Sequence, residues 1–272
     1  MVGVMVKRKN NLIAFQGELG ANGDLACRAV CTDMETLPCH TFQDTFAAVH
    51  EDRADYLLIP IDNTVAGRVA DIHHLLPDSG LHIIGEHFQR VEHHLLVVKG
   101  TKLKELTHVH SHVHALNQCR KAIQDYGLEP MVHVDTAAAA REIAERGDKS
   151  HAAIASELAG NIYGLESLRA NIEDANHNTT RFLLMAKQQL TLSPDDNALI
   201  TSFVFRVRNV SAALYKALGG FATNGVNMIK LESYLIGGGF IAAQFYAEVE
   251  GHPEKQEVSL AMEELSFFTH EV

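Results

Sequence analysis

Hydrophobic and polar positions along residues 10–188 follow two periods that alternate with each other. Short apolar runs of strand length are separated by segments in which apolar residues recur at helical spacing. Strand-like runs lie at residues 12–15, 56–61, 81–86, 94–98, 107–110, 131–134 and 152–155, and helical segments start near residue 24 and lie at 41–50, 69–76, 115–126, 136–146 and 157–163. Alternating strands and helices favour mostly parallel α/β sheets. Because the alternation comes in two blocks, it predicts two lobes with a cleft between them.

Leu190–Asp196 marks a change of pattern and is typical of a linker. After it we expect, in order, a strand, a helix, two strands, a helix and a strand, at residues 198–207, 211–223, 226–233, 240–249, 253–265 and 267–272, with turns at 224–225 and Gly237–Gly239. This βαββαβ order is that of ferredoxin-like modules. The chain is therefore expected to form two domains, 10–188 and 197–272, the first returning to its first lobe near 170–186. A small module with an open sheet commonly pairs with its own copy, which predicts a homodimer or homotetramer.

The charge balance narrows the choice of partners. With 23 basic and 34 acidic residues the net charge is −11, so the chain repels nucleic-acid phosphates and anionic lipid. No apolar run approaches the length of a membrane-spanning helix, and no signal-peptide stretch follows the basic residues within Met1–Asn10. The four cysteines form no CxxC pair, so we expect reduced thiols in a cytoplasmic protein.

Histidine is the unusual count, at 17 residues. Every second residue of His108–His114 is a histidine, and on a strand this alternation would put several imidazoles on one face. No HExxH or CxxC motif accompanies the run, and histidine pairs occur elsewhere in the chain. Ser111 is expected to cap a helix that starts after it. We therefore expect no metal, and a chelator-sensitive metallohydrolase is the last-ranked interpretation.

Three polar clusters stand where strand-like runs end, namely Pro60–Gly67, Ser111-His112 and Asn178–Phe182. Loop residues from several elements commonly converge on one cleft, so we expect these clusters to meet in one site. Arg181 can bind a carboxylate with its planar guanidinium, and the Thr180 hydroxyl can donate a hydrogen bond.

The clusters resemble motifs of the prephenate dehydratase family, which reads Pro-Ile-Glu-Asn-Ser-x-x-Gly, Ser-His-Pro-x-Ala-Leu-x-Gln-Cys and Thr-Arg-Phe. This chain has Asp62 for Glu, Thr64 for Ser and Val113 for Pro. The resemblance covers residues 11–272 and implies a two-lobed, periplasmic-binding-protein-like α/β catalytic domain, followed by an α+β ferredoxin-like ACT regulatory domain.

Two further segments follow family patterns, and a third departs from them. Asp135-Thr136-Ala137 and Ala153–Ser156 resemble family motifs, and Thr136 is expected to cap its helix and, second, to receive a substrate carboxylate. The glycine-rich turn Gly17–Gly23 lacks the Tyr and Ser of the family. This difference bears on rate or on pocket shape more than on the type of reaction.

The resemblance implies a lyase that converts prephenate to phenylpyruvate, CO2 and water in L-phenylalanine biosynthesis, without cofactor or metal. Such a protein must hold two carboxylates, stabilise the leaving hydroxyl with a donor and exclude water. The expected catalytic residues are Thr180, Asn63, Thr64 and His112, and the expected substrate-binding residues are Arg181, Phe182, Ser111, Gln118 and Thr136.

In the C-terminal module, two short segments stand where the family has Gly-Ala-Leu and Glu-Ser-Arg-Pro. The resemblance implies that they bind L-phenylalanine as a feedback effector, through Ala212, Ala213, Leu214, Glu232 and Ser233. Ala212 replaces a glycine, and Tyr234-Leu235 replace Arg-Pro, so the strength and sign of the effect stay open.

Two alternatives remain beside this interpretation. The same enzyme could act on arogenate, in which an amine replaces the side-chain keto group. A protein of another class, a non-catalytic amino-acid sensor, would also have two lobes and a cleft. It would give no reason for a threonine and an arginine at 180–181 beside Asn63 and Thr64.

Overall fold

The computed structural model describes residues 9–196, 198–208, 210–235 and 242–272. Contacts within the chain separate it into two compact units, Met1–Leu190 and Thr191–Val272, which are described one at a time. The turn predicted at Gly237–Gly239 and the N-terminal residues 1–8 lie outside the described residues. No described helix has the length and apolar character that crossing a membrane requires.

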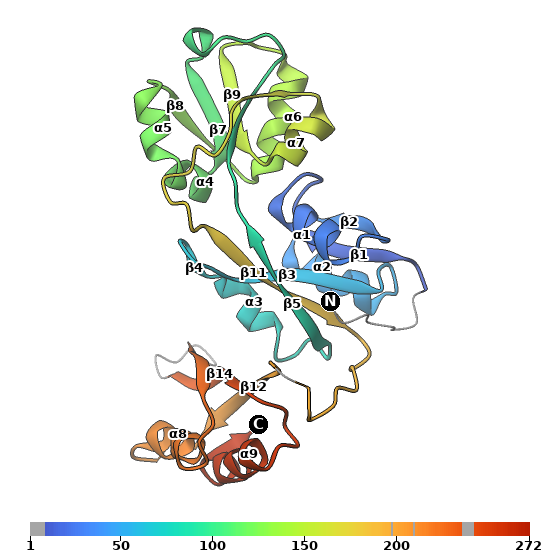
Figure 1. Ribbon diagram of the computed structural model, residues 1–272, viewed down its shortest axis with the longest axis vertical. Coiled ribbons are helices and arrows are strands. Elements are labelled where there is room, and N and C mark those ends of the chain that lie inside the picture. The colour runs from blue at the N-terminus through green and yellow to red at the C-terminus, as the bar shows by residue number, and fades with distance from the viewer. Residues whose placement is uncertain (1–8, 197, 209, 236–241) are drawn as a thin grey trace. The chain divides into compact units, whose positions relative to one another are not determined.

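The first lobe of the N-terminal unit is built on a sheet whose strand order is not the order of the sequence. Its elements are β1 (Leu12–Gln16), α1 (Asn22–Val30), β2 (Glu35–Cys39), α2 (Phe42–His50), β3 (Tyr56–Asn63), β4 (Gly67–Arg68), α3 (Ala70–Leu75), β5 (His82–Arg90) and β11 (Thr179–Ala186). The order is β2-β1-β3-β11-β5, with β4 paired to β3. Figure 1 shows the gold strand β11 between β3 and β5, and it is antiparallel to both.

The second lobe has a sheet of the same kind. Its elements are β6 (His94–Val97), the 3-10 helix η1 (Leu103–Glu105), β7 (His108–His112), α4 (Val113–Gln118), α5 (Arg120–Asp125), β8 (Glu129–His133), α6 (Thr136–Arg146), β9 (His151–Ala155), α7 (Glu157–Tyr163) and β10 (Glu166–Arg169). The order is β10-β6-β9-β7-β8, in which β7 is parallel to β8 and β9, and β6 is antiparallel to β9 and β10.

In each lobe one inner strand arrives directly from the other lobe. Strand β6 follows the first crossing of the chain, and β11 follows its return. The predicted architecture is confirmed in that the unit is α/β and two-lobed.

The core follows from the apolar runs in the sequence. Ile13, Ala14 and Phe15 of β1 are all fully buried, as expected for a parallel strand that is covered on both faces. One hydrophobic cluster joins such residues to the second lobe, where its members are mostly alanines, among them Ala137, Ala139, Ala140, Ala153 and Ala155. Small side chains allow the backbones of the two lobes to approach closely, so the lobes share this cluster, while a separate cluster around Leu95, Val109 and Ile154 belongs to the second lobe.

The glycine-rich turn after β1 fastens the first lobe to the second. A Cβ on Gly20, whose φ is +89°, would lie 2.6 Å from the Ala159 Cα atom, so only glycine fits there. Close by, the Glu18 carboxylate accepts hydrogen bonds of 2.9 and 3.1 Å from the Arg141 guanidinium. The turn therefore serves as an anchor between the lobes.

Three local predictions were wrong. His112, not Ser111, is the N-cap of α4, because β7 runs through Ser111. Asp135, not Thr136, caps α6, since its carboxylate accepts from the N–H groups of Ala137 and Ala138. The helix expected at 115–126 is two helices broken at Cys119, where the Asp174 carboxylate accepts from the first N–H groups of α5.

The C-terminal unit has the predicted βαββαβ order, which is confirmed. Its elements are β12 (Ile200–Val207), α8 (Ala213–Thr223), β13 (Met228–Leu235), β14 (Ala242–Glu250), α9 (Gln256–Phe268) and β15 (Thr269–Glu271). The sheet is antiparallel, in the order β13-β14-β12-β15. Phe205, Phe221, Phe245 and Leu265 form much of the core between the sheet and the two helices.

The residues expected to bind an effector lie on two elements of this unit. Ala212 precedes α8, with Ala213 and Leu214 in its first turn, and the other two, Glu232 and Ser233, lie on β13. Ala212 has φ +57°, in the left-handed region that favours glycine, so replacing the family's glycine strains the backbone at the start of α8.

Candidate active site

Thr180 and Asn63 are brought together by the register of β11 on β3. They are directly opposite each other in the ladder, and the Asn63 Nδ2 group donates a 2.9 Å hydrogen bond to Thr180 Oγ1. Thr180 is 9% exposed. A bulge at Ile61 shifts the register between Arg181 and Phe182, one residue along β11 from this pair.

The direction of this hydrogen bond is fixed by the backbone. Asn63 Oδ1 accepts from the N–H groups of Val65 and Ala66 at 2.9 and 2.7 Å. Of the two polar atoms of the Asn63 amide, only the oxygen can accept from N–H groups, so the nitrogen must face Thr180. The Thr180 oxygen is therefore an acceptor here, and its own proton remains available for donation to another group.

A chain of side-chain amides extends the pair into the second lobe. Asn63 Nδ2 also donates to Asn178 Oδ1 at 2.8 Å, and Asn178 Nδ2 donates to Gln118 Oε1 at 2.9 Å. Gln118 Oε1 lies 2.9 Å from His93 Nε2 as well. Since the Gln118 oxygen faces the chain, its Nε2 group is a donor that no described residue accepts. Gln118 was expected to bind substrate, and this donor suits a carboxylate.

Two of the predicted hydroxyl groups are instead bonded to backbone. Thr64 Oγ1 donates to His177 O at 2.7 Å and accepts from Thr179 N at 3.0 Å, which ties the loop after β3 to β11. Ser111 is fully buried, and its hydroxyl donates to Ile154 O at 2.6 Å, across to β9. Both hydroxyls hold the framework of the site.

Arg181 and Phe182 also lie away from the Thr180 hydroxyl. Alternation along β11 puts Arg181 on the face opposite Thr180, where its Nε donates to Glu86 Oε2 at 2.7 Å and its NH1 is 4.0 Å from Asp62 Oδ2. Phe182 is 3% exposed and belongs to the hydrophobic core. It supports β11 from within instead of lining an open surface.

His112 is the last residue of β7 and Thr136 is the first residue of α6, both in the second lobe. His112 Nδ1 accepts from His114 N at 3.3 Å, which leaves the ring proton on Nε2. Burial, with His114 nearby, lowers the pKa of His112, while Asp135 beside it acts to raise that pKa. A neutral His112 can therefore donate from Nε2 at neutral pH. None of the hydrogen bonds between described residues links it to Thr180.

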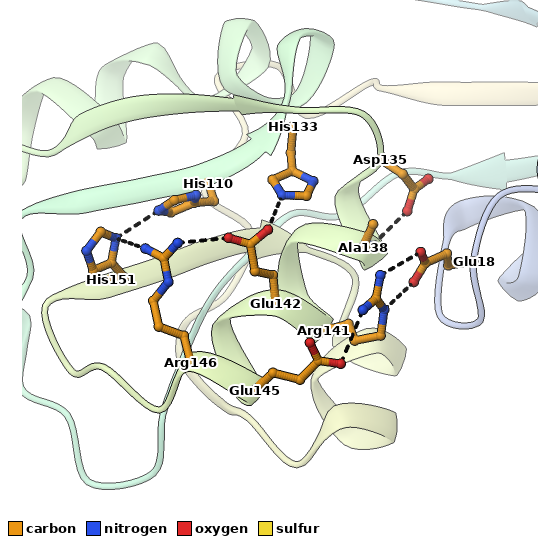
Figure 2. Close-up of polar contacts among 10 residues, drawn as sticks. All are labelled: Glu18, His110, His133, Asp135, Ala138, Arg141, Glu142, Glu145, Arg146 and His151. Carbon is orange, nitrogen blue, oxygen red and sulfur yellow. Dashed lines mark hydrogen bonds and ion pairs between the residues drawn. The ribbon is translucent and has the colours of Figure 1, made fainter.

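A second polar cluster occupies one end of the second lobe, beside the anchor formed by Glu18. Figure 2 shows Glu142 between His133 and Arg146, and the distances are 2.6 Å to His133 Nε2 and 2.9 Å to Arg146 NH2. Arg146 NH1 and His110 Nε2 both reach His151 Nδ1, at 3.3 and 2.8 Å. Among the described residues, no group of three or more His, Cys, Asp or Glu side chains is arranged to hold a metal ion.

This cluster predicts a loss of stability in mild acid. His110 is 5% exposed, and burial together with His151 and Arg146 lowers its pKa from 6.5 to about 4. The unfolded chain therefore takes up this proton at a higher pH than the folded chain. The free energy of unfolding should fall as the pH drops from about 6.5 to about 4, by up to about 3 kcal/mol from this group. Denaturant unfolding at pH 7 and pH 4.5 measures the change.

The matched variant for this measurement is His110→Gln, which keeps a donor for His151 and cannot titrate. Its free energy of unfolding should fall less than that of the wild type between the same two pH values. Equal losses in both proteins would contradict the assignment to His110.

A cavity of about 370 Å³ lies elsewhere in the second lobe, between β6, β10 and α7. Its walls include Leu96, Leu165 and Gly160, with Ser167 and Lys99 among its polar residues. Ser167 Oγ is 2.9 Å from the buried His94 Nδ1. This cavity is not lined by Thr180 or by the side chains hydrogen-bonded in series to it, which are Asn63, Asn178, Gln118 and His93.

Sequence reasoning missed His93 and Glu86, and it placed Asn178 in the predicted cluster Asn178–Phe182 without giving it a role. That role had a local signal, because Asn178 is two residues before Thr180 and an extended chain puts both on one side. The contacts of His93 and Glu86 depend on the return of β11 and carry no local signal.

Comparison with known proteins gives consistent matches. A family model described as prephenate dehydratase matches residues 13–190. A Komagataeibacter europaeus protein named bifunctional N-acyl-homoserine lactone acylase/prephenate dehydratase is 51% identical over 260 residues, which cover 96% of this chain and 92% of that protein. An Arabidopsis thaliana protein named arogenate dehydratase/prephenate dehydratase 1 is 38% identical over 221 residues, which cover 81% of this chain and 56% of that protein.

Two solved structures share the fold over nearly the whole chain. GqqA, described as a novel type of quorum quenching acylase, has a TM-score of 0.89 at 51% identity, covering 96% of this chain and 94% of that one. Prephenate dehydratase from Arthrobacter aurescens in complex with L-Phe has a TM-score of 0.86 at 26% identity, covering 95% and 86%.

Proposed function

This chain belongs to the prephenate dehydratase family, and we propose that it converts prephenate to phenylpyruvate, CO2 and water. The observation that carries the proposal is the Thr180 hydroxyl, which accepts from Asn63 and keeps its proton for a leaving group. The carbon–carbon bond to the ring carboxylate breaks, and its electrons enter the ring as the hydroxyl leaves. The hydroxyl departs as water when it receives a proton, and aromatisation drives the reaction.

The remaining residues have supporting roles in this proposal. Asn63 orients Thr180, and the Nε2 donor of Gln118 binds a substrate carboxylate. His112 is the candidate source of a proton in the second lobe, because its neutral ring carries the proton on Nε2. Arg181 supplies positive charge on the other face of β11, and Thr64 and Ser111 hold the loops in place.

The test is phenylpyruvate formation by the wild type from prephenate, measured beside phenylalanine formation from arogenate. We expect a higher kcat/KM with prephenate. A higher value with arogenate would make this chain an arogenate dehydratase, and no turnover of either substrate would leave the amino-acid sensor as the interpretation.

We also propose that the C-terminal unit is an ACT domain that binds L-phenylalanine as a feedback effector. Its ferredoxin-like order and the L-Phe complex of the Arthrobacter aurescens relative support this. The assembly is proposed to be a homodimer or homotetramer in the cytoplasm. Titration calorimetry with L-phenylalanine and light scattering with and without it test binding and assembly.

A second candidate function is hydrolysis of N-acyl amides. The 51% identical relative is named a bifunctional acylase, and the Ser167–His94 pair beside the cavity supports such chemistry here. Ser167 would attack the acyl carbonyl while His94 takes the hydroxyl proton and passes it to the leaving amine, and water would then release the acid. The test is release of homoserine lactone from an N-acyl-homoserine lactone by the wild type and by Ser167→Ala. Equal release by both would rule out this pair.

A further inference from the structure

The two segments that cross between the lobes run side by side and are bonded to each other. Val91 N donates to Asn178 O at 2.9 Å, and Ile172 N donates to His93 O at 3.0 Å. His93 N also donates to Glu173 Oε2 at 3.0 Å. The backbones of His93 and Asn178 are therefore fixed in the connection between the lobes, although neither residue belongs to a helix or strand.

The side chain of His93 is held in one protonation state. It is 2% exposed, and burial lowers its pKa, so the ring is neutral near pH 7 and carries one proton. Its partner at 2.9 Å is Gln118 Oε1, which also accepts from Asn178 Nδ2. Because an amide oxygen only accepts, the His93 proton must be on Nε2.

The amides are thereby held from both ends, by His93 at Gln118 and by the N–H groups of Val65 and Ala66 at Asn63. Because the His93 Nε2–H group faces Gln118, the Gln118 side chain keeps its oxygen toward His93 and Asn178. Asn178 must therefore present its nitrogen to Gln118 and its oxygen to Asn63. Asn63 then donates to both Asn178 and Thr180. Were Gln118 to turn over, two donors would face each other at Asn178, and Asn178 would lose the hydrogen bond that holds it against Asn63.

We propose that His93 and Asn178 are positioning residues that hold the Thr180 hydroxyl in its proton-donating orientation, acting through Gln118 and Asn63. The inference rests on the proposed function. It assigns a role to the connection between the lobes: Gln118 lies in the second lobe and Thr180 in the first, so a rotation of the lobes would disturb the hydroxyl.

The experiment compares His93→Leu, which removes the ring donor, with His93→Gln, which restores an N–H at the same reach. Loss of one buried hydrogen bond predicts a fall in kcat of about tenfold for His93→Leu, with KM changed by less than about threefold. His93→Gln should recover most of kcat. The matched control is His110→Leu, since His110 is also a buried histidine with one 2.8 Å ring contact, outside the chain. It should keep its kcat.

The second arm asks whether His93 acts through Thr180. In a Thr180→Ala background, His93→Leu should lower the residual kcat by less than about twofold, because residues in one network are not additive. The proposal would be overturned if the two substitutions lowered kcat by factors that multiply, or if His93→Leu lowered KM and kcat together. An equal fall of kcat in His110→Leu would overturn it as well.

A third measurement separates this inference from the proposed function. Nitrogen-15 NMR of the histidine rings in the wild type should show one neutral ring with its proton on Nε2 and slow exchange with solvent. That signal should vanish in His93→Gln. A proton on Nδ1, or titration of that ring near pH 6.5, overturns the inference whatever the enzyme does. A wild type inactive on both substrates would contradict the proposed function. The NMR result would then still show whether His93 donates from Nε2 to Gln118.

Discussion

Replacing Thr180 with alanine is expected to lower kcat for phenylpyruvate formation by about 10²–10⁴-fold, the usual worth of a positioned proton donor. The wild-type oxygen accepts from Asn63, so its proton is directed elsewhere, and alanine removes this donor without opening a large cavity. KM should change little, because the interaction is made with the leaving hydroxyl as it departs. Steady-state kinetics above the spontaneous rate measure both quantities.

Two variants make this result specific. Thr180→Ser keeps the hydroxyl and should retain much more activity than Thr180→Ala. Thr179→Ala removes a neighbouring hydroxyl on the opposite face of β11 and should behave like the wild type. If Thr179→Ala and Thr180→Ala lost equal activity, the loss would come from a disturbed strand β11 and not from the missing Thr180 hydroxyl.

Replacing Arg181 with alanine is expected to lower kcat/KM by roughly 10- to 100-fold, which corresponds to about 1.5–3 kcal/mol for a charge-assisted interaction. The guanidinium lies 2.7 Å from Glu86 and 4.0 Å from Asp62. Without it, two carboxylates beside the site lose their counter-charge and repel a dianionic substrate. The effect should therefore appear mainly in KM.

The discriminating control is the double variant Arg181→Ala with Glu86→Gln. Removing one negative charge should recover part of kcat/KM if Arg181 acts by neutralising its neighbours. No recovery would mean that the guanidinium binds a substrate carboxylate directly, as the sequence resemblance implies. Glu86→Gln alone reports any effect of the ion pair on folding.

The sequence predicted the two α/β blocks, the βαββαβ module and the convergence of Asn63, Gln118 and Thr180. These follow from apolar periodicity and from motifs at strand ends, which are local signals. The ends of elements were less predictable. Ser111 was expected to cap a helix, but β7 continues through it to His112, and its hydroxyl turns inward to Ile154 O.

Other features depend on long-range register, which no local pattern encodes. The bulge at Ile61 puts Thr180 beside Asn63, and alternation then sends Arg181 to the other face, although the two are adjacent in sequence. Strand β2 was missed because it is an edge strand that contains Pro38, and proline is tolerated at a sheet edge. The break at Cys119 likewise needs Asp174, from the returning segment.

The position of β11 between β3 and β5 has a consequence for biosynthesis on the ribosome. Asn63 and Thr180 are 117 positions apart, so the first sheet lacks its inner strand until most of the N-terminal unit has been translated. Pairings of such high sequence separation form slowly, and in the interval β3 and β5 are unpaired edges that can bind other chains. The strand that completes the sheet also brings Thr180, so a nascent chain completes its first lobe and gains the hydroxyl that we propose to be catalytic in the same step.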